Sequence, residues 1–177
     1  TLSVIDLQTF DTLYRIPVAV NLHHLQTDAH HQLWVSSRGD YFDEHSRLYC
    51  IDTRTDKVID SVLTAVSDMW LDGDSLYFYG TEFSYETYNW TVTYGIVNVR
   101  THQLLTSSFI TDGTATDIQK PYGIIVHPVT KAIFLTDAKT YVAPGTLHCY
   151  SKEGKRLWSV TTGDIPAHIC FRYQTNP

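Results

Sequence analysis

One short phrase occurs four times along the sequence, and its spacing limits what the chain can fold into. The copies occupy residues 1–9, 47–55, 93–101 and 146–154. In each copy an apolar run leads to a short polar residue, two further residues, and Thr or Gly. The polar position is Asp6, Asp52, Asn98 or Ser151. The step from 6 to 52 is 46 residues, the step from 52 to 98 is also 46, and the step from 98 to 151 is 53.

Each copy predicts a β-hairpin. The apolar runs alternate in side-chain direction and are rich in Val, Ile, Leu, Tyr and Cys, which suits a half-buried strand. A short polar side chain at the next position accepts a hydrogen bond from the backbone two residues on and so fixes a tight turn. A second β-rich run then follows in every copy, over residues 12–16, 57–62, 103–109 and 156–160.

Further pairs of apolar runs precede the hairpins, so the repeat contains four strands in the order a, b, c and d. A period in the forties with this content is typical of a β-propeller blade. We therefore predict an all-β fold, a β-propeller of four-stranded antiparallel blades. The full blades are expected over residues 20–63, 66–110 and 120–161, the outer hairpin of a truncated blade over 1–18, and the inner strand of the closing blade over 165–171.

Three full blades cannot close a ring, since propellers have four to eight. A seven-bladed ring at this period needs roughly 320 residues. The sequence is therefore expected to be about half of a larger propeller. Its partner would be a missing N-terminal half or a second chain.

Composition excludes some classes of protein and leaves the cysteines with a simple role. The net charge is −6, which argues against a nucleic-acid surface, and no run of 18 apolar residues suggests a membrane span. Cys50 and Cys149 stand where Val4 and Ile96 stand in other copies, so we expect buried, unpaired side chains. Cys170 follows the pattern of an inner strand, and no redox or zinc spacing exists.

The connections between strands b and c are the long ones, over residues 37–46, 81–91 and 138–145. Long loops on a rigid scaffold commonly carry function, and exposed aromatic side chains give large contact area. We predict that these loops hold a ligand on one face of the propeller. The alternative is that their rings pack over blade edges. The candidate aromatic residues are Tyr41, Phe42, Tyr85, Tyr88, Trp90 and Tyr141.

The inner strands begin at the same face and are expected to ring the mouth of a central channel. The candidate ligand-binding residues there are His24, Asp68, Tyr122 and His168. No spacing typical of a metal site accompanies the histidines, so no metal is predicted. His30 and His31 are expected on the opposite face, in solvent.

Catalytic signatures are missing from the sequence. It contains no nucleophile elbow, P-loop, dinucleotide fingerprint or HExxH motif. The acidic loop residues have no partner pattern and are interpreted as solvated charge. The tripeptide 38–40 reads Arg-Gly-Asp and is interpreted as a chance match. We therefore predict a protein that is not an enzyme and needs no cofactor.

A family resemblance covers the whole chain. Residues 121–128 read Pro-Tyr-Gly-Ile-Ile-Val-His-Pro, residues 132–137 form a strand, and residues 4–9 and 50–55 read Val/Cys-Ile-Asp-x-x-Thr. These segments resemble YVTN-type propeller repeats. The sequence departs from that pattern where His23-His24 and Asp68-Met69 replace the Pro-x-Gly entry.

The resemblance implies an extracytoplasmic bacterial protein of the periplasm or cell surface, anchored through a lipid on an absent N-terminus. One similar subgroup consists of surface lipoproteins that capture cobalamin beside an outer-membrane transporter. Cobalamin or a similar large polar molecule is therefore the expected ligand, and such a transporter is a candidate partner. The alternatives are a propeller enzyme of the lyase or lactonase type, with its site at the channel mouth, and a protein–protein interaction scaffold.

Overall fold

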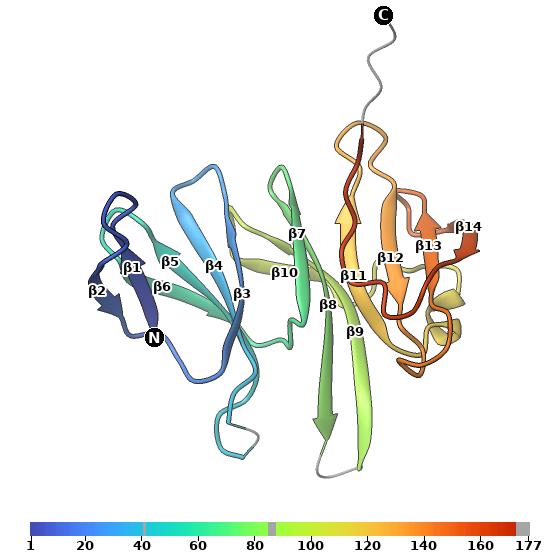
Figure 1. Cartoon of the computed structure of the whole chain (residues 1–177), viewed down its shortest axis with the longest axis horizontal. Coiled ribbons are helices and arrows are strands. Elements are labelled where there is room, and N and C mark those ends of the chain that lie inside the picture. The colour runs from blue at the N-terminus through green and yellow to red at the C-terminus, as the bar shows by residue number, and fades with distance from the viewer. Residues whose placement is uncertain (41, 85–87, 173–177) are drawn as a thin grey trace, which may run out of the picture.

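The computed structural model describes residues 1–40, 42–84 and 88–172, which form antiparallel sheets and one short helix. Three sheets have four strands each and follow one another along the chain (Figure 1). Within each sheet every strand pairs with the next one in sequence. The all-β prediction and the four-stranded antiparallel sheets are confirmed, and no sheet within the described residues closes on itself.

The three sheets have these bounds. The first contains β3 (Leu22–Thr27), β4 (Gln32–Ser37), β5 (Arg47–Asp52) and β6 (Lys57–Val62). The second contains β7 (Asp68–Asp72), β8 (Ser75–Ser84), β9 (Asn89–Asn98) and β10 (Gln103–Thr106). The third contains β11 (Pro121–Val126), β12 (Ile133–Asp137), β13 (Thr146–Tyr150) and β14 (Arg156–Thr161).

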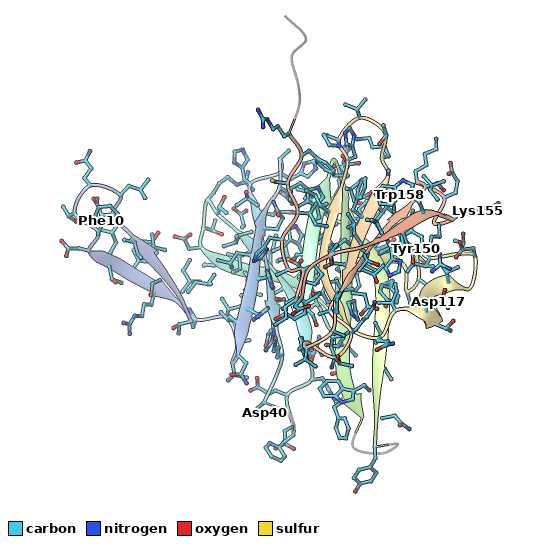
Figure 2. All side chains as sticks on the ribbon, turned by 45° about the vertical axis from the view of Figure 1, so that its right-hand side comes forward. Phe10, Asp40, Asp117, Tyr150, Lys155 and Trp158 are labelled. Carbon is cyan, nitrogen blue, oxygen red and sulfur yellow. The ribbon has the colours of Figure 1, made fainter. Side chains whose placement is uncertain are left out.

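The remaining elements are small. A two-stranded hairpin of β1 (Leu2–Ile5) and β2 (Thr12–Ile16) precedes the first sheet, and the 3₁₀-helix η1 (Thr114–Asp117) lies between the second and third sheets. Figure 2 shows Phe10, in the β1–β2 turn, standing clear of the three sheets. No helix in the described part of the chain is long and apolar enough to cross a membrane.

The repeated polar residue fixes the turns as the sequence predicted. The Asp6 Oδ1 accepts hydrogen bonds from the amides of Gln8 and Thr9, at 2.8 and 2.9 Å. Asn98 receives the amides of Arg100 and Thr101 at 3.0 and 2.9 Å. Asp52 and Ser151 make corresponding bonds in their own turns. The turns also share a left-handed residue, with φ of 61° at Phe10, 56° at Asp56 and 57° at His102.

Two apolar cores hold the sheets together, one at each junction between neighbours. Trp34, Leu48 and Cys50 of the first sheet pack against side chains such as Phe78 and Val97 of the second. A second core joins the second and third sheets through residues that include Tyr94, Phe109, Leu135 and Tyr150. Cys50 and Cys149 are buried and unpaired, which confirms their predicted role, whereas Cys170 is exposed.

The first strands of the sheets lie beside one another. β7 neighbours both β3 and β11, so the sheets extend outward from a common line (Figure 1). A side chain joins two of these strands, because the Asp68 carboxylate on β7 accepts a hydrogen bond from the amide of Ile124 on β11 at 3.2 Å.

The two ends of the sheets carry different connections. The connections β4–β5, β8–β9 and β12–β13 lie at one end, here called the long-connection end, and tight turns lie at the other (Figure 1). Figure 2 shows Asp40, in the β4–β5 connection, at the end where the β8–β9 hairpin also terminates.

One expected loop is a hairpin extension instead. Residues 81–91 are predicted to be a loop, but β8 extends through residues 81–84 and β9 begins at Asn89, with register pairs from Thr81↔Val92 to Ser84↔Asn89. β-branched and aromatic residues in these paired stretches favour the extended conformation. Phe83 and Trp90 therefore stand on paired strands, which hold them more rigidly than a loop would.

Residues 165–171 form no hydrogen-bonded strand with other described residues. The segment runs along β11, since a Cβ added at Gly123 would overlap the carbonyl oxygen of Ala167. Phe171 packs edge-on against the rings of His127 and Phe134, with centroids 4.7 and 5.4 Å away. Pairing of this segment with outer strands stays a prediction.

Candidate functional site

A pocket of about 600 Å³ opens at the long-connection end of the molecule. Its walls come from the β4–β5 connection, the paired ends of β8 and β9, the residues leading into β11, and the β12–β13 connection. Parts of all three four-stranded sheets therefore meet around it. A volume of this size is in the range of small-molecule sites.

Aromatic side chains form much of the pocket wall. Phe42, Phe83, Trp90 and Tyr141 all line it. The Trp90 side chain is 63% exposed, and its ring meets Phe83 edge-on with centroids 5.4 Å apart. Phe83 and Trp90 are register partners across the hairpin, so strand pairing positions both rings. The Trp90 indole is thus supported by Phe83 and still largely exposed.

Lys120 brings a positive charge to these rings. Its ammonium lies 5.8 Å from the Trp90 centroid and 5.5 Å from the Tyr141 centroid. A cation at this distance from a ring face is attracted by the negative charge of the π system. The ammonium therefore links the β8–β9 hairpin to the β12–β13 connection.

The buried carboxylate of Asp137 holds this wall in place. It accepts hydrogen bonds from the amides of Gln119 and Lys120, at 3.1 and 2.8 Å, and from the amide of Lys139 at 2.8 Å. Two connections that are distant in sequence are thus fixed to one side chain. Asp137 ends β12, so the sheet itself determines where Lys120 lies.

Asp40 shapes the β4–β5 connection, which supplies another part of the pocket wall. Its Oδ1 accepts hydrogen bonds from the amides of Phe42 and Glu44, at 2.9 and 2.8 Å. Gly39 has a φ of 67° and lies against the carbonyl of Glu44, where no side chain fits. The Arg-Gly-Asp tripeptide therefore builds a turn, and its carboxylate is engaged within that turn.

A group of polar residues lies beside the pocket at the start of the inner strands. Arg38 Nη2 lies 2.8 Å from His23 Nε2, and His24 Nδ1 lies 3.5 Å from the Asp68 Oδ1. Burial lowers the pKa of His24, and the charges of Arg38 and His168 lower it further. Burial also raises the pKa of Asp68, against the effect of its hydrogen bonds to backbone amides.

The predicted site residues separate into three groups. Phe42, Trp90 and Tyr141 line the pocket together, and Tyr122 contacts Tyr141 edge-on at 5.5 Å. His24, Asp68 and His168 influence one another electrostatically but do not line the pocket. Tyr88 is exposed at the hairpin tip, away from the lining residues. Tyr41 and Tyr85 lie outside the described residues.

Two pocket residues, Arg38 and Lys120, were not among the predicted site residues. Arg38 was interpreted only as part of a chance tripeptide, and Lys120 was assigned no role. A signal for Lys120 does exist, because it directly precedes the Pro-x-Gly entry of β11 and so must lie at the long-connection end.

A second constellation, at the short-turn end, has the outline of a catalytic triad. His102 Nδ1 lies 2.9 Å from the Asp60 Oδ2, and its Nε2 lies 3.9 Å from the Cys50 Sγ. The Cys50 side chain is fully buried, however, and this burial raises the pKa of its thiol to about 12. A thiol in this environment is a poor nucleophile, so the constellation is structural.

No group of three or more His, Cys, Asp or Glu side chains suited to a metal ion occurs among the residues that the structure describes. At the short-turn end, His30 instead pairs with Asp74 at 2.8 Å.

No family model matches the chain, and no curated protein matches it at a significant level.

Proposed function

We propose that this chain is a non-catalytic ligand-binding β-propeller whose ligand occupies the pocket at the long-connection end. The observation that carries the proposal is the convergence of Phe42 from the β4–β5 connection, Trp90 from β9 and Tyr141 from the β12–β13 connection around one pocket of about 600 Å³. Exposed aromatic rings on a rigid frame are the usual anchors of a binding site.

The architecture supports the propeller part of the proposal. Three antiparallel meanders follow one another with their first strands side by side, as blades do around an axis. A ring needs at least four blades, so further blades would come from another segment or from a second chain. The hairpin β1–β2 and residues 165–171 are the edges at which such a partner would join.

The nature of the ligand is proposed from the YVTN resemblance. It favours cobalamin or a similar large polar molecule, held at the cell surface or in the periplasm by a lipid-anchored protein beside an outer-membrane transporter. Aromatic rings and carboxylates around a wide pocket suit a ligand with a flat ring system and many hydrogen-bonding groups.

Calorimetric titration of the protein with cobalamin tests the proposal. Trp90→Ala should weaken binding by about 1–3 kcal/mol if its ring is an anchor. Tyr88→Ala is the matched control, since Tyr88 lies on the same hairpin and does not line the pocket. His31→Ala, at the short-turn end, should also leave affinity unchanged. Weaker binding in His31→Ala together with unchanged binding in Trp90→Ala would refute the assignment of the binding face.

The enzyme alternative has one observation in its favour. His24 and Asp68 lie together beside Arg38, and burial shifts the pKa of both His24 and Asp68 toward the neutral form. Neutral acids and bases of this kind serve in proton transfer. Hydrolysis of a model lactone that disappears in His24→Gln but persists in Trp90→Ala would favour this function over binding alone.

A further inference from the structure

Two positive side chains of the pocket have no carboxylate partner in the part of the chain that the structure describes. Lys120 and Arg38 both line it, and neither makes an ion pair with any described residue. Elsewhere in the chain Arg54, Lys131 and Arg156 each lie 2.7 Å from a carboxylate oxygen. The lining of the pocket thus holds two cations against two carboxylates, Glu44 and Glu82, in a protein with a net charge of −6.

The Lys120 ammonium is held in position by contacts that leave its hydrogen-bond donors available. Its backbone amide is fixed by the buried Asp137, and its charge lies over the faces of Trp90 and Tyr141. A cation–π contact depends on the charge of the ammonium, so its N–H groups can still donate hydrogen bonds to a ligand. An anion entering the pocket would therefore meet a cation that is already oriented.

Arg38 is similarly available. Its Nη2 contacts the His23 ring nitrogen at 2.8 Å, and no hydrogen bond from its Nε or Nη1 is present within the described residues. A guanidinium can bind a carboxylate, sulfonate or phosphate through two parallel hydrogen bonds. The side chain is exposed and lines the pocket together with Lys120.

The pocket also offers a surface for a flat ring. Trp90 is the most suitable partner, because its indole is largely exposed and is supported by Phe83. Glu44 and Glu82 line the pocket as well. Their charge disfavours a small inorganic anion, which has no ring contact to offset the repulsion.

We infer that the pocket takes a flat aromatic ligand that carries an anionic group, with its ring against Trp90 and its anion facing Lys120, and with Arg38 as the second cation. This inference rests on the proposed binding function and adds the class of ligand. The anion is a carboxylate, sulfonate or phosphate group, since all three offer the same oxygen acceptors.

Three naphthalene derivatives that share one ring system test the inference by calorimetry. They are naphthalene-2-sulfonate, the neutral 2-naphthalenemethanol and the cationic (2-naphthylmethyl)trimethylammonium. We expect the sulfonate to bind at least tenfold more tightly than the other two, and Lys120→Gln to remove that preference. Lys139→Gln is the matched control, because Lys139 shares the Asp137 anchor but does not line the pocket. Lys120→Arg should retain part of the preference.

The outcomes separate the inference from the proposed function. Equal binding of all three probes, lost in Trp90→Ala, would retain the binding site and overturn the anionic class. Tighter binding of the ammonium probe would also overturn it and would indicate an aromatic cage for cations. Sulfonate binding that is unaffected by both Trp90→Ala and Lys120→Gln would count against the pocket itself, and absence of sulfonate binding would overturn the inference.

Discussion

The Asp68 carboxylate on β7 accepts a hydrogen bond from the Ile124 amide on β11, across the junction of two sheets that also share an apolar core. The same carboxylate receives the Met69 amide at 2.9 Å. The backbone of a first strand has an unpaired edge, and a side chain that accepts from it satisfies a donor that burial would otherwise leave without a partner.

Asp68→Ala should therefore lower the free energy of unfolding by about 1–3 kcal/mol, the usual cost of leaving a buried donor unsatisfied. Urea unfolding followed by fluorescence measures it. Asp68→Asn keeps an acceptor oxygen and should lose less, whereas Asp43→Ala, at an exposed position, should change little. Unchanged or higher stability of Asp68→Ala would show that the desolvation of the carboxylate outweighs its hydrogen bonds.

Gly123 controls how closely residues 165–172 approach β11. Gly123→Ala should displace this segment, since the new Cβ would overlap the Ala167 carbonyl oxygen. The expected result is faster cleavage by trypsin at Arg172 and faster amide exchange over the segment. Gly163→Ala is the control, because no heavy atom lies within 4 Å of the added Cβ there. Equal exchange in the two variants would contradict the close approach.

The three cysteines should differ in reactivity. Cys170 is exposed and should react with a thiol reagent within the native protein, whereas Cys50 and Cys149 should react only on unfolding. Burial raises the pKa of both buried thiols, to about 12 at Cys50, and so removes the reactive thiolate as well as access. Labelling followed by mass spectrometry of the peptides measures this. Rapid native labelling of Cys50 would reopen the question of its pairing with His102.

The stability of the fold should fall as the pH drops below about 6.5, the usual pKa of an unfolded histidine. Burial lowers the pKa of His148, so the unfolded state binds a proton at a pH where the folded state does not. The contribution of His148 to the free energy of unfolding is fully present above its pKa in the unfolded state. It is lost as the pH falls toward its lower pKa in the folded state. The His23 and His24 pKa values are lowered and act in the same direction, while the raised pKa of Asp68 acts oppositely.

His148→Gln separates these contributions. The variant should lose less stability than the parent protein between pH 7.5 and 5.5, as measured by urea midpoints at the two values. His31→Gln, at an exposed turn position, should keep the parental dependence. A parental slope in His148→Gln would assign the acid sensitivity to the other histidines.

The repeat predicted the strands well because the interactions that form its turns are between residues close in sequence. A polar acceptor at Asp6, Asp52, Asn98 or Ser151 needs only the following few residues to form its turn, and all four do so. Burial of Cys50 and Cys149 followed from the residues in equivalent slots. Both features can be predicted from one sequence, because the turns depend on adjacent residues and the burial follows from comparing copies of the repeat.

The site was predicted only in outline, because its geometry depends on neighbours in space. The candidate aromatics Phe42, Trp90 and Tyr141 do meet at one pocket. The hairpin extension that carries Trp90 was missed, since a run of aromatic and polar residues after a strand resembles a loop until its partner strand is known. Lys120 was missed for a similar reason, because its contact with Trp90 spans two sheets.

The consecutive pairing of strands has a consequence for synthesis on the ribosome. Each four-stranded sheet is complete once its fourth strand has emerged, since all of its strands are consecutive in the chain. Short-range pairing of this kind has a small loop-closure cost and favours fast folding. The first sheet can form before the second is translated, and its Trp34 and Leu48 then offer a ready surface on which Phe78 and Val97 condense. Folding would thus proceed from the N-terminus to the C-terminus, and each new sheet would pack against the one formed before it.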